Sequence, residues 1–216
     1  MAWRMASVSL ILTIVFAIAN VEDGLTHSQK MQFLNAHNSL RRSVRPPARN
    51  MKTMKWCREL ENTAQNYANQ CIWGHNPNRH TWPFSYVGEN LYTSTGNIQD
   101  YGSVVRSWYD EVKYYNYRSN TCVKSKMCGH YTQVVWAHSD RLGCGVARCA
   151  SLRNLPSFRN ALNVVCNYGP GGNIVGQRPY STTRKRSSVK TIEDGGELFQ
   201  ETDGFVDSDE NELLAI

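Results

Sequence analysis

Seven cysteines, all lying between Cys57 and Cys166, constrain the fold of this 216-residue chain more than any other feature. None of them belongs to a CxxC pair, the spacing expected of a zinc ribbon or a thioredoxin-like redox site. In an oxidising compartment such a set is typical of a disulfide framework. Because the number is odd, one thiol is expected to have no partner.

The N-terminus indicates that the chain enters such a compartment. Arg4 precedes an apolar run from Val8 to Ala19, and Ala17-Ile18-Ala19 supplies the small residues that signal peptidase accepts. We therefore predict a signal peptide over residues 1–19 and a secreted, extracellular protein. The run is shorter than the ~20 apolar residues needed to cross a bilayer, so no transmembrane anchor is expected.

Charge divides the remaining chain into two parts. Residues 20–186 hold 22 Lys and Arg against 9 Asp and Glu, whereas residues 187–216 hold one Lys against 9 acidic residues. The acidic part is broken by glycines and poor in aromatics, a composition typical of disorder. We predict a folded domain over 20–181 and an acidic disordered tail over 182–216. The basic domain suits anionic lipid headgroups or glycans, and nucleic acid is not an expected partner of a secreted protein.

Hydrophobic spacing predicts an α+β fold in which the helices come first. Met31, Leu34, His37, Asn38 and Arg41 fall at helical spacing within 27–44, and apolar residues recur at helical intervals over 57–71 and 101–115. Two β-rich runs follow, Leu142 to Cys149 and Ala161 to Tyr168, and both carry cysteines. This order differs from the regular βαβ alternation of a parallel sheet.

Five short segments carry a resemblance to a known family. In chain order they are AHNSLR (36–41), WGHN (73–76), GENLY (88–92), GHYTQVVW (129–136) and CNYGPGGNI (166–174). Together they resemble the CAP superfamily, which joins cysteine-rich secretory proteins, insect venom allergens and plant pathogenesis-related proteins. Among its secreted members, the chain is most similar to the peptidase inhibitor 16-like and venom allergen-like groups.

The resemblance implies a three-layer α-β-α sandwich with a small antiparallel sheet between the helices. It also implies the disulfide pairs Cys71–Cys149, Cys144–Cys166 and Cys122–Cys128, whereas the sequence alone leaves many pairings open. Cys57 has no partner in this scheme. Its place beside Lys55 and Arg58, at the start of a predicted helix, would favour a reactive thiolate; the alternative is a buried, inert thiol.

The same resemblance implies a central cleft with two histidines and two glutamates. The residues at matching positions are His75, Glu89, Glu111 and His130. Neutral imidazoles are good ligands for Zn²⁺, and a neighbouring carboxylate fixes the tautomer of each ring. We expect a weak, non-essential divalent-metal site. The alternative is a polar network that ties the three layers together.

Binding rather than catalysis is the expected function. Some family members bind sterols or other lipids through an aromatic loop near the cleft, and here Trp82, Phe84 and Tyr86 alternate just before GENLY. These rings would suit a flat apolar ligand, or would simply cover an edge of the sheet. Neither a GxSxG turn nor an HExxH pair is present, so we expect no enzyme. The alternative function is recognition of an extracellular protein, including modulation of a protease.

Overall fold

The computed structural model describes residues 24–182, and the predicted signal peptide and the acidic segment beyond Thr182 lie outside this range. Its elements in chain order are α1 (His27–Arg42), β1 (Lys55–Trp56), α2 (Arg58–Ala68), β2 (Gly88–Ser94), α3 (Gly102–Tyr109), the 3-10 helix η1 (Asp110–Tyr114), β3 (Tyr115–Asn116), β4 (Thr121–Cys122), α4 (Gly129–Val134), β5 (Arg141–Leu152) and β6 (Leu155–Gly169).

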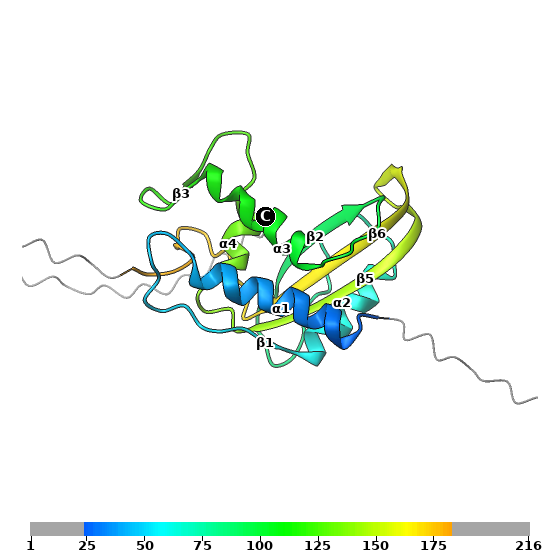
Figure 1. Ribbon diagram of the computed structural model, residues 1–216, viewed down its shortest axis with the longest axis horizontal. Helices are drawn as coiled ribbons and strands as arrows, with labels where there is room; N and C mark the ends of the chain where they lie inside the picture. Colours follow the sequence, from blue (N-terminus) through cyan, green and yellow to red (C-terminus); the bar gives the residue numbers. More distant parts are fainter. Residues whose placement is uncertain (1–23, 183–216) are drawn as a thin grey trace, which may run out of the picture.

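A four-stranded sheet in the order β1-β5-β6-β2 forms the middle layer (Figure 1). Strands β5 and β6 form a long antiparallel hairpin, and β2 pairs antiparallel with β6 from Gly88 opposite Tyr168 to Ser94 opposite Leu162. The short strand β1 joins β5 in parallel. Strands β3 and β4 form a separate two-stranded hairpin.

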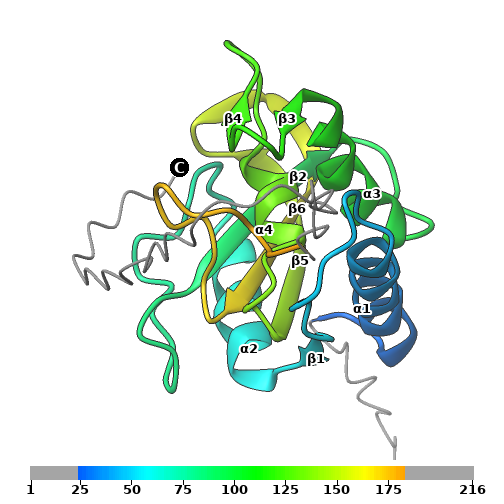
Figure 2. The same cartoon turned by 90° about the vertical axis from the view of Figure 1, so that its left-hand side faces the viewer.

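Side-chain alternation along β6 shows what covers each face of this sheet. Val164, Cys166 and Tyr168 belong to a buried cluster that includes residues of α1 and α3. Val165 instead packs with Ala64, Tyr67 and Ala68 of α2. Because successive strand residues point to opposite faces, α1 and α3 cover one face and α2 covers the other. Figure 2 shows α1 and α3 together on one side, apart from α2. The fold is the α-β-α sandwich that the sequence predicted.

Helix α1 begins with a capping box and carries two buried polar residues. The Thr26 side chain accepts from the Gln29 amide, and the Gln29 side chain accepts from the Thr26 amide. One turn apart inside the helix, His37 and Arg41 are almost completely buried. They connect this helix to the sheet and to α4.

The buried Arg41 guanidinium donates hydrogen bonds to a set of backbone carbonyls. It donates at 2.7–3.3 Å to the carbonyls of Lys52, Val134, Trp136, Ala137 and Ser139. Val134 is the last residue of α4, and Trp136, Ala137 and Ser139 follow it within five residues; the last carbonyls of a helix have no partner within the helix. Burial lowers the pKa of Arg41 to about 10, and the guanidinium holds the end of α4 against α1.

Several predicted boundaries differ from the structure, and five elements were not predicted: β1, β2, β3, β4 and α4. The second helix ends at Ala68, and the third continues beyond Tyr109 only as a 3-10 helix. The β5–β6 hairpin extends well beyond the two predicted strands. Strand β2 was missed because its stability comes from pairing with β6, and α4 because its six residues are too short to show a period.

The structure contains three disulfides, Cys71–Cys149, Cys122–Cys128 and Cys144–Cys166, which are the pairs that the resemblance implies. Cys57 is buried and its thiol donates to Glu59 Oε2 at 3.1 Å. Burial raises the pKa of this thiol, so the thiolate interpretation is wrong and the buried alternative holds. Within residues 24–182, no helix has both the length and the apolar character needed to cross a membrane.

Candidate binding cleft with two histidine–glutamate pairs

The first pair joins the loop after α2 to the edge strand β2. His75 Nδ1 lies 2.7 Å from Glu89 Oε1, and the Asn76 amide donates to the same oxygen at 2.9 Å. The Glu89 side chain is 1% exposed, whereas that of His75 is 40% exposed. Because the buried carboxylate accepts the Nδ1 proton, Nε2 of His75 keeps its lone pair.

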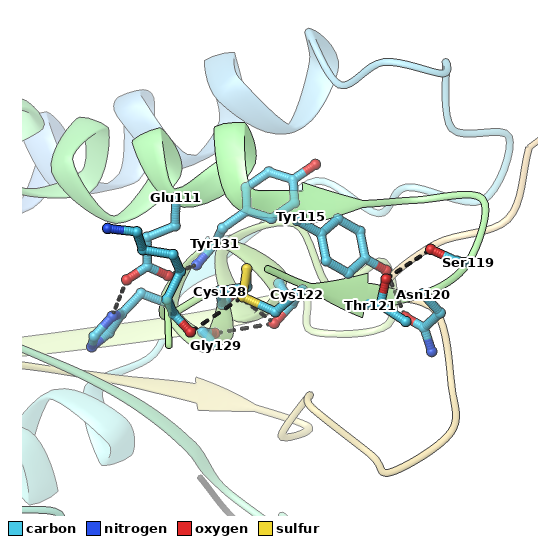
Figure 3. The surroundings of a disulfide bond; sticks show 12 residues. Glu111, Tyr115, Ser119, Asn120, Thr121, Cys122, Cys128, Gly129 and Tyr131 are labelled. Carbon is cyan, nitrogen blue, oxygen red and sulfur yellow. Dashed lines mark hydrogen bonds and ion pairs between the residues drawn. A yellow bond between two sulfur atoms is a disulfide. The ribbon is translucent and has the colours of Figure 1, made fainter. Parts of the chain in front are cut away.

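The second pair joins η1 to α4. His130 Nδ1 lies 2.7 Å from Glu111 Oε1, and the Tyr131 amide donates to Glu111 Oε2 at 3.1 Å. Figure 3 shows Glu111 and Tyr131 in the surroundings of the Cys122–Cys128 disulfide. The Trp108 ring stacks on His130 with an interplanar angle of 14°. The carboxylate and the indole together fix both the tautomer and the orientation of the imidazole.

Both histidines line one cleft of about 400 Å³, within the size range of small-molecule sites. Asn90 connects the two pairs, because it follows Glu89 on β2 and its amide donates to the His130 carbonyl at 3.1 Å. Glu89 also lines the cleft, whereas Glu111 lies behind His130 and does not. The structure therefore brings three of the four predicted residues to the cleft wall and places the fourth as a support.

The donor set fits a metal only in part. Two imidazole Nε2 atoms are available, and each ring has the carboxylate partner that is usual for a metal-binding histidine. Within the part of the chain that the structure describes, however, no three His, Cys, Asp or Glu side chains gather as a metal site. Any ion held by the two rings would need water for its remaining positions, which means weak binding.

The rim of the cleft is unusually apolar for an exposed surface. Four large apolar side chains are strongly exposed in residues 24–182: Trp82, Val123, Met127 and Val175. Met127 and Val175 line the cleft, together with Tyr115, Trp136 and Ile174. Val123 lies next to Cys122, whose disulfide to Cys128 also lines the cleft. Exposed apolar groups that gather at a cavity mark a surface that binds something apolar.

The predicted aromatic loop lies elsewhere. None of Trp82, Phe84 and Tyr86 lines the cleft. Phe84 packs on a small cluster that contains Leu60 and Val87. Tyr86 lies over Gly171, where a Cβ atom would come within 2.4 Å of the ring, so the second glycine of CNYGPGGNI is needed for this packing. Trp82 alone is exposed, at 84%.

Sequence reasoning did not identify the apolar wall of the cleft. Its most exposed residues come from two segments, Met127 from the disulfide loop between β4 and α4 and Val175 from the chain after β6, while Tyr115 and Trp136 come from β3 and from the chain just after α4. The available signal was Val123 and Met127 inside a short, Lys-rich loop closed by two cysteines, where apolar side chains have little core to enter.

Comparison with known proteins establishes the family. Residues 34–168 match the model of the CAP, cysteine-rich secretory protein family, and the chain belongs to this family. It is 42% identical over 156 residues to peptidase inhibitor 16 of Mus musculus, a match that covers 72% of this chain and 30% of that protein. It is 44% identical over 154 residues to GLIPR1-like protein 1 of Mus musculus, covering 69% and 62%. The chain thus spans only about a third of the peptidase inhibitor 16 relatives.

Solved structures show the same fold. Venom allergen-like protein 4 of Schistosoma mansoni aligns with a TM-score of 0.60 at 28% identity, over 74% of this chain and 97% of that one. A structure described as NaASP2 with Zn²⁺ aligns with a TM-score of 0.59 at 32% identity, over 74% and 88%.

Proposed function

We propose that this protein is a secreted, non-enzymatic binding protein that holds a sterol or another flat lipid in the cleft between His75, His130 and the β3–β4 hairpin. The observation that carries the proposal is the gathering of Met127 and Val175, two of the four strongly exposed large apolar side chains, at the rim of a single cavity. An apolar ligand would cover this surface, and the polar histidine end would receive a hydroxyl or headgroup.

The charges beside the β3–β4 hairpin are consistent with uptake of the lipid ligand from a membrane. The ammonium groups of Lys113 and Lys126 both lie 5.1 Å from the centre of the Tyr114 ring. Apolar tips flanked by lysines are typical of surfaces that approach anionic lipid headgroups.

The local chemistry favours binding over catalysis. Each cleft histidine is hydrogen-bonded to a glutamate, and neither has a Ser or Cys nucleophile within hydrogen-bond distance in the described residues. The Thr132 hydroxyl, which lines the cleft, is already bonded to Asn173 Oδ1 at 2.7 Å. The names of the peptidase inhibitor 16 and 15 relatives support a non-enzymatic role, and they also carry the alternative, a protein-binding or protease-modulating function.

A weak zinc site at the polar end of the same cleft is the second part of the proposal. The two imidazole Nε2 atoms would hold the ion, with water completing its coordination. Support comes from the carboxylate-fixed tautomers and from the related structure described with Zn²⁺.

The test is equilibrium binding of the fluorescent sterol dehydroergosterol to the full mature chain. Val175→Asp, which places a charge on the cleft rim, should weaken binding about tenfold or more. Trp82→Asp is the matched control, because it replaces a large apolar residue that is even more exposed than Val175 and lies outside the cleft. Loss of binding in Trp82→Asp with normal binding in Val175→Asp would assign the ligand to the aromatic loop instead. If the wild type does not bind sterol but inhibits trypsin, the alternative function, modulation of a protease, is favoured.

A further inference from the structure

A second, larger depression has a different character from the cleft. It measures about 1470 Å³ and lies between the α1–β1 connection, the turn of the β3–β4 hairpin and the last described residues of the chain. Its polar lining includes Asn50, Arg118, His138, Gln177, Arg178, Ser181 and Thr182, and none of its lining residues is acidic. We call it the basic groove. In Figure 1 this orange C-terminal part lies at the opposite end of the molecule from the tip of the β5–β6 hairpin.

Two arginines present guanidinium groups inside the basic groove. Arg178 is held in place, since Nε donates to the Tyr117 carbonyl at 3.0 Å and a terminal nitrogen donates to the Arg118 carbonyl at 2.7 Å. Its second terminal nitrogen has no bond to any described residue. The side chain of Arg118 makes neither a hydrogen bond nor an ion pair within residues 24–182, so its whole guanidinium is available.

Two further arginines flank the basic groove. Arg49 is fixed beside it by Ser181, which accepts from the Arg49 amide at 2.8 Å and from Arg49 Nε at 3.2 Å. Arg45 lies near the edge of the groove, because its carbonyl accepts from the Tyr180 hydroxyl at 3.4 Å, but its guanidinium donates to the carbonyls of Ser43 and Val44 and is not counted as a groove charge. The Arg and Lys ion pairs of the described residues involve Lys30, Lys52, Arg106 and Arg141. No carboxylate in that part of the chain therefore forms an ion pair with Arg49, Arg118 or Arg178.

We propose that the basic groove binds a sulfated polysaccharide of the heparin class. Guanidinium groups pair with sulfate oxygens in a bidentate geometry, and a row of them with no acidic neighbours suits a polymer that carries several sulfates. The amides of Asn50 and Gln177 and the hydroxyl of Ser181 can bond sugar hydroxyls. A membrane surface fits less well, because none of the four exposed large apolar residues lines this groove. This site is separate from the cleft and does not depend on the function proposed for it.

The experiment measures binding of a heparin octasaccharide to the full mature chain by calorimetry at several NaCl concentrations. Arg49→Gln with Arg118→Gln removes two charges from the basic groove. The matched control, Arg153→Gln with Arg159→Gln, removes two exposed charges near the tip of the β5–β6 hairpin whose guanidinium groups make no bond to a described residue. The groove pair should raise Kd about tenfold or more and reduce the salt slope by about two, while the control changes Kd less than about threefold.

Residues 187–216 carry nine acidic side chains and come shortly after the last groove residue in the sequence. Because such charges could compete with sulfates for the arginines, the measurement is repeated with all nine changed to Asn or Gln. Groove-dependent binding in either background supports the proposal. Absence of octasaccharide binding in both backgrounds overturns it. An equal loss in the groove pair and in the control pair also overturns it, because net charge alone would then explain the affinity. Groove-dependent binding of phosphatidylserine vesicles without octasaccharide binding would assign the groove to lipid and refute a glycan site.

Discussion

His37 should make the stability of this protein strongly dependent on pH. Its ring is fully buried in the core, with Nδ1 donating to the Phe33 carbonyl at 2.8 Å and Nε2 accepting from the Tyr168 hydroxyl at 2.9 Å. The pKa of His37 falls from 6.5 to about 3: burial is the largest cause, the bond to the Phe33 carbonyl opposes it, and the nearby charge of Arg41 adds to the lowering. The folded protein therefore keeps this imidazole neutral well into the acid range.

The magnitude follows from the difference between the folded and unfolded states. Above pH 6.5 the imidazole is neutral in both, and its contribution to stability is fully present. As pH falls toward 3, the unfolded chain takes up a proton that the folded protein refuses, so folding free energy is lost at about 1.4 kcal/mol per pH unit. The loss reaches about 2 kcal/mol by pH 5 and about 5 kcal/mol near pH 3.

The assay is urea denaturation at pH 7, 6 and 5, with the disulfides intact. His37→Gln lacks the titrating ring and should cost about 1–3 kcal/mol at pH 7 for the altered packing. Between pH 7 and 5 the wild type should lose about 2 kcal/mol more than this variant, since contributions of other groups cancel in the comparison. His80→Gln, at an exposed histidine, should keep the wild-type slope. Parallel pH dependences for the wild type and His37→Gln would refute the reasoning.

Three further outcomes follow from the packing and from the cleft. Arg41→Met should lower the free energy of unfolding by about 3 kcal/mol or more, because the carbonyls of Lys52, Val134 and Ser139 lose their side-chain donor and two further carbonyls lose one of their donors. Arg42→Met, on the exposed side of the same helix, should change it by less than about 0.5 kcal/mol, and similar values for the two variants would contradict this role. Gly145→Ala should lower the free energy of unfolding by about 3 kcal/mol, because its Cβ would lie 2.3 Å from the Gln65 backbone in α2. The control is Gly96→Ala, whose Cβ meets only a side-chain oxygen at 3.6 Å; equal shifts of the melting temperature in the two variants would show that α2 can move away. Calorimetry should show weak zinc binding to the wild type that weakens at acid pH, because only a neutral imidazole can ligate the ion. Binding should disappear in the double variant His75→Ala, His130→Ala and persist in the control His138→Ala; equal binding by the wild type and the double variant would exclude the histidine pair as the site.

The sequence predicted the parts of the fold that depend on local pattern. Helix α2 has clear apolar periodicity, α1 shows helical spacing in which the buried positions are Phe33, His37 and Arg41, and the β5 and β6 runs have strong β propensity. Strand β2 has few apolar residues, and its place depends on β6, which lies about 70 residues later in the chain. Such a contact is invisible to a window of neighbouring residues, so GENLY was noticed as a motif but not as a strand.

The state of Cys57 was ambiguous for a similar reason. Its charged neighbours Lys55 and Arg58 predicted a thiolate, but both side chains are exposed, whereas the thiol lies in a small cluster with Leu60 and Val87. Desolvation then outweighs the local charges. The apolar wall of the cleft was missed because its two segments meet only after the hairpin and the chain beyond β6 have packed together.

Strand β2, which sequence reasoning overlooked, positions both halves of the cleft. Glu89 and Asn90 are consecutive on β2, so their side chains point to opposite faces of the sheet. Glu89 pairs with Asn167 of β6, and its carboxylate accepts from His75. Asn90 pairs with Cys166, on the face of the core cluster, and its side-chain amide donates to the Tyr168 hydroxyl and to the His130 carbonyl. A shift of one residue in the β2–β6 register would bury the carboxylate against the Tyr168–His37 core and direct the amide toward His75. The seven-residue pairing with β6 prevents that shift, so the geometry of the two histidines depends on sheet register as much as on the residues they contact.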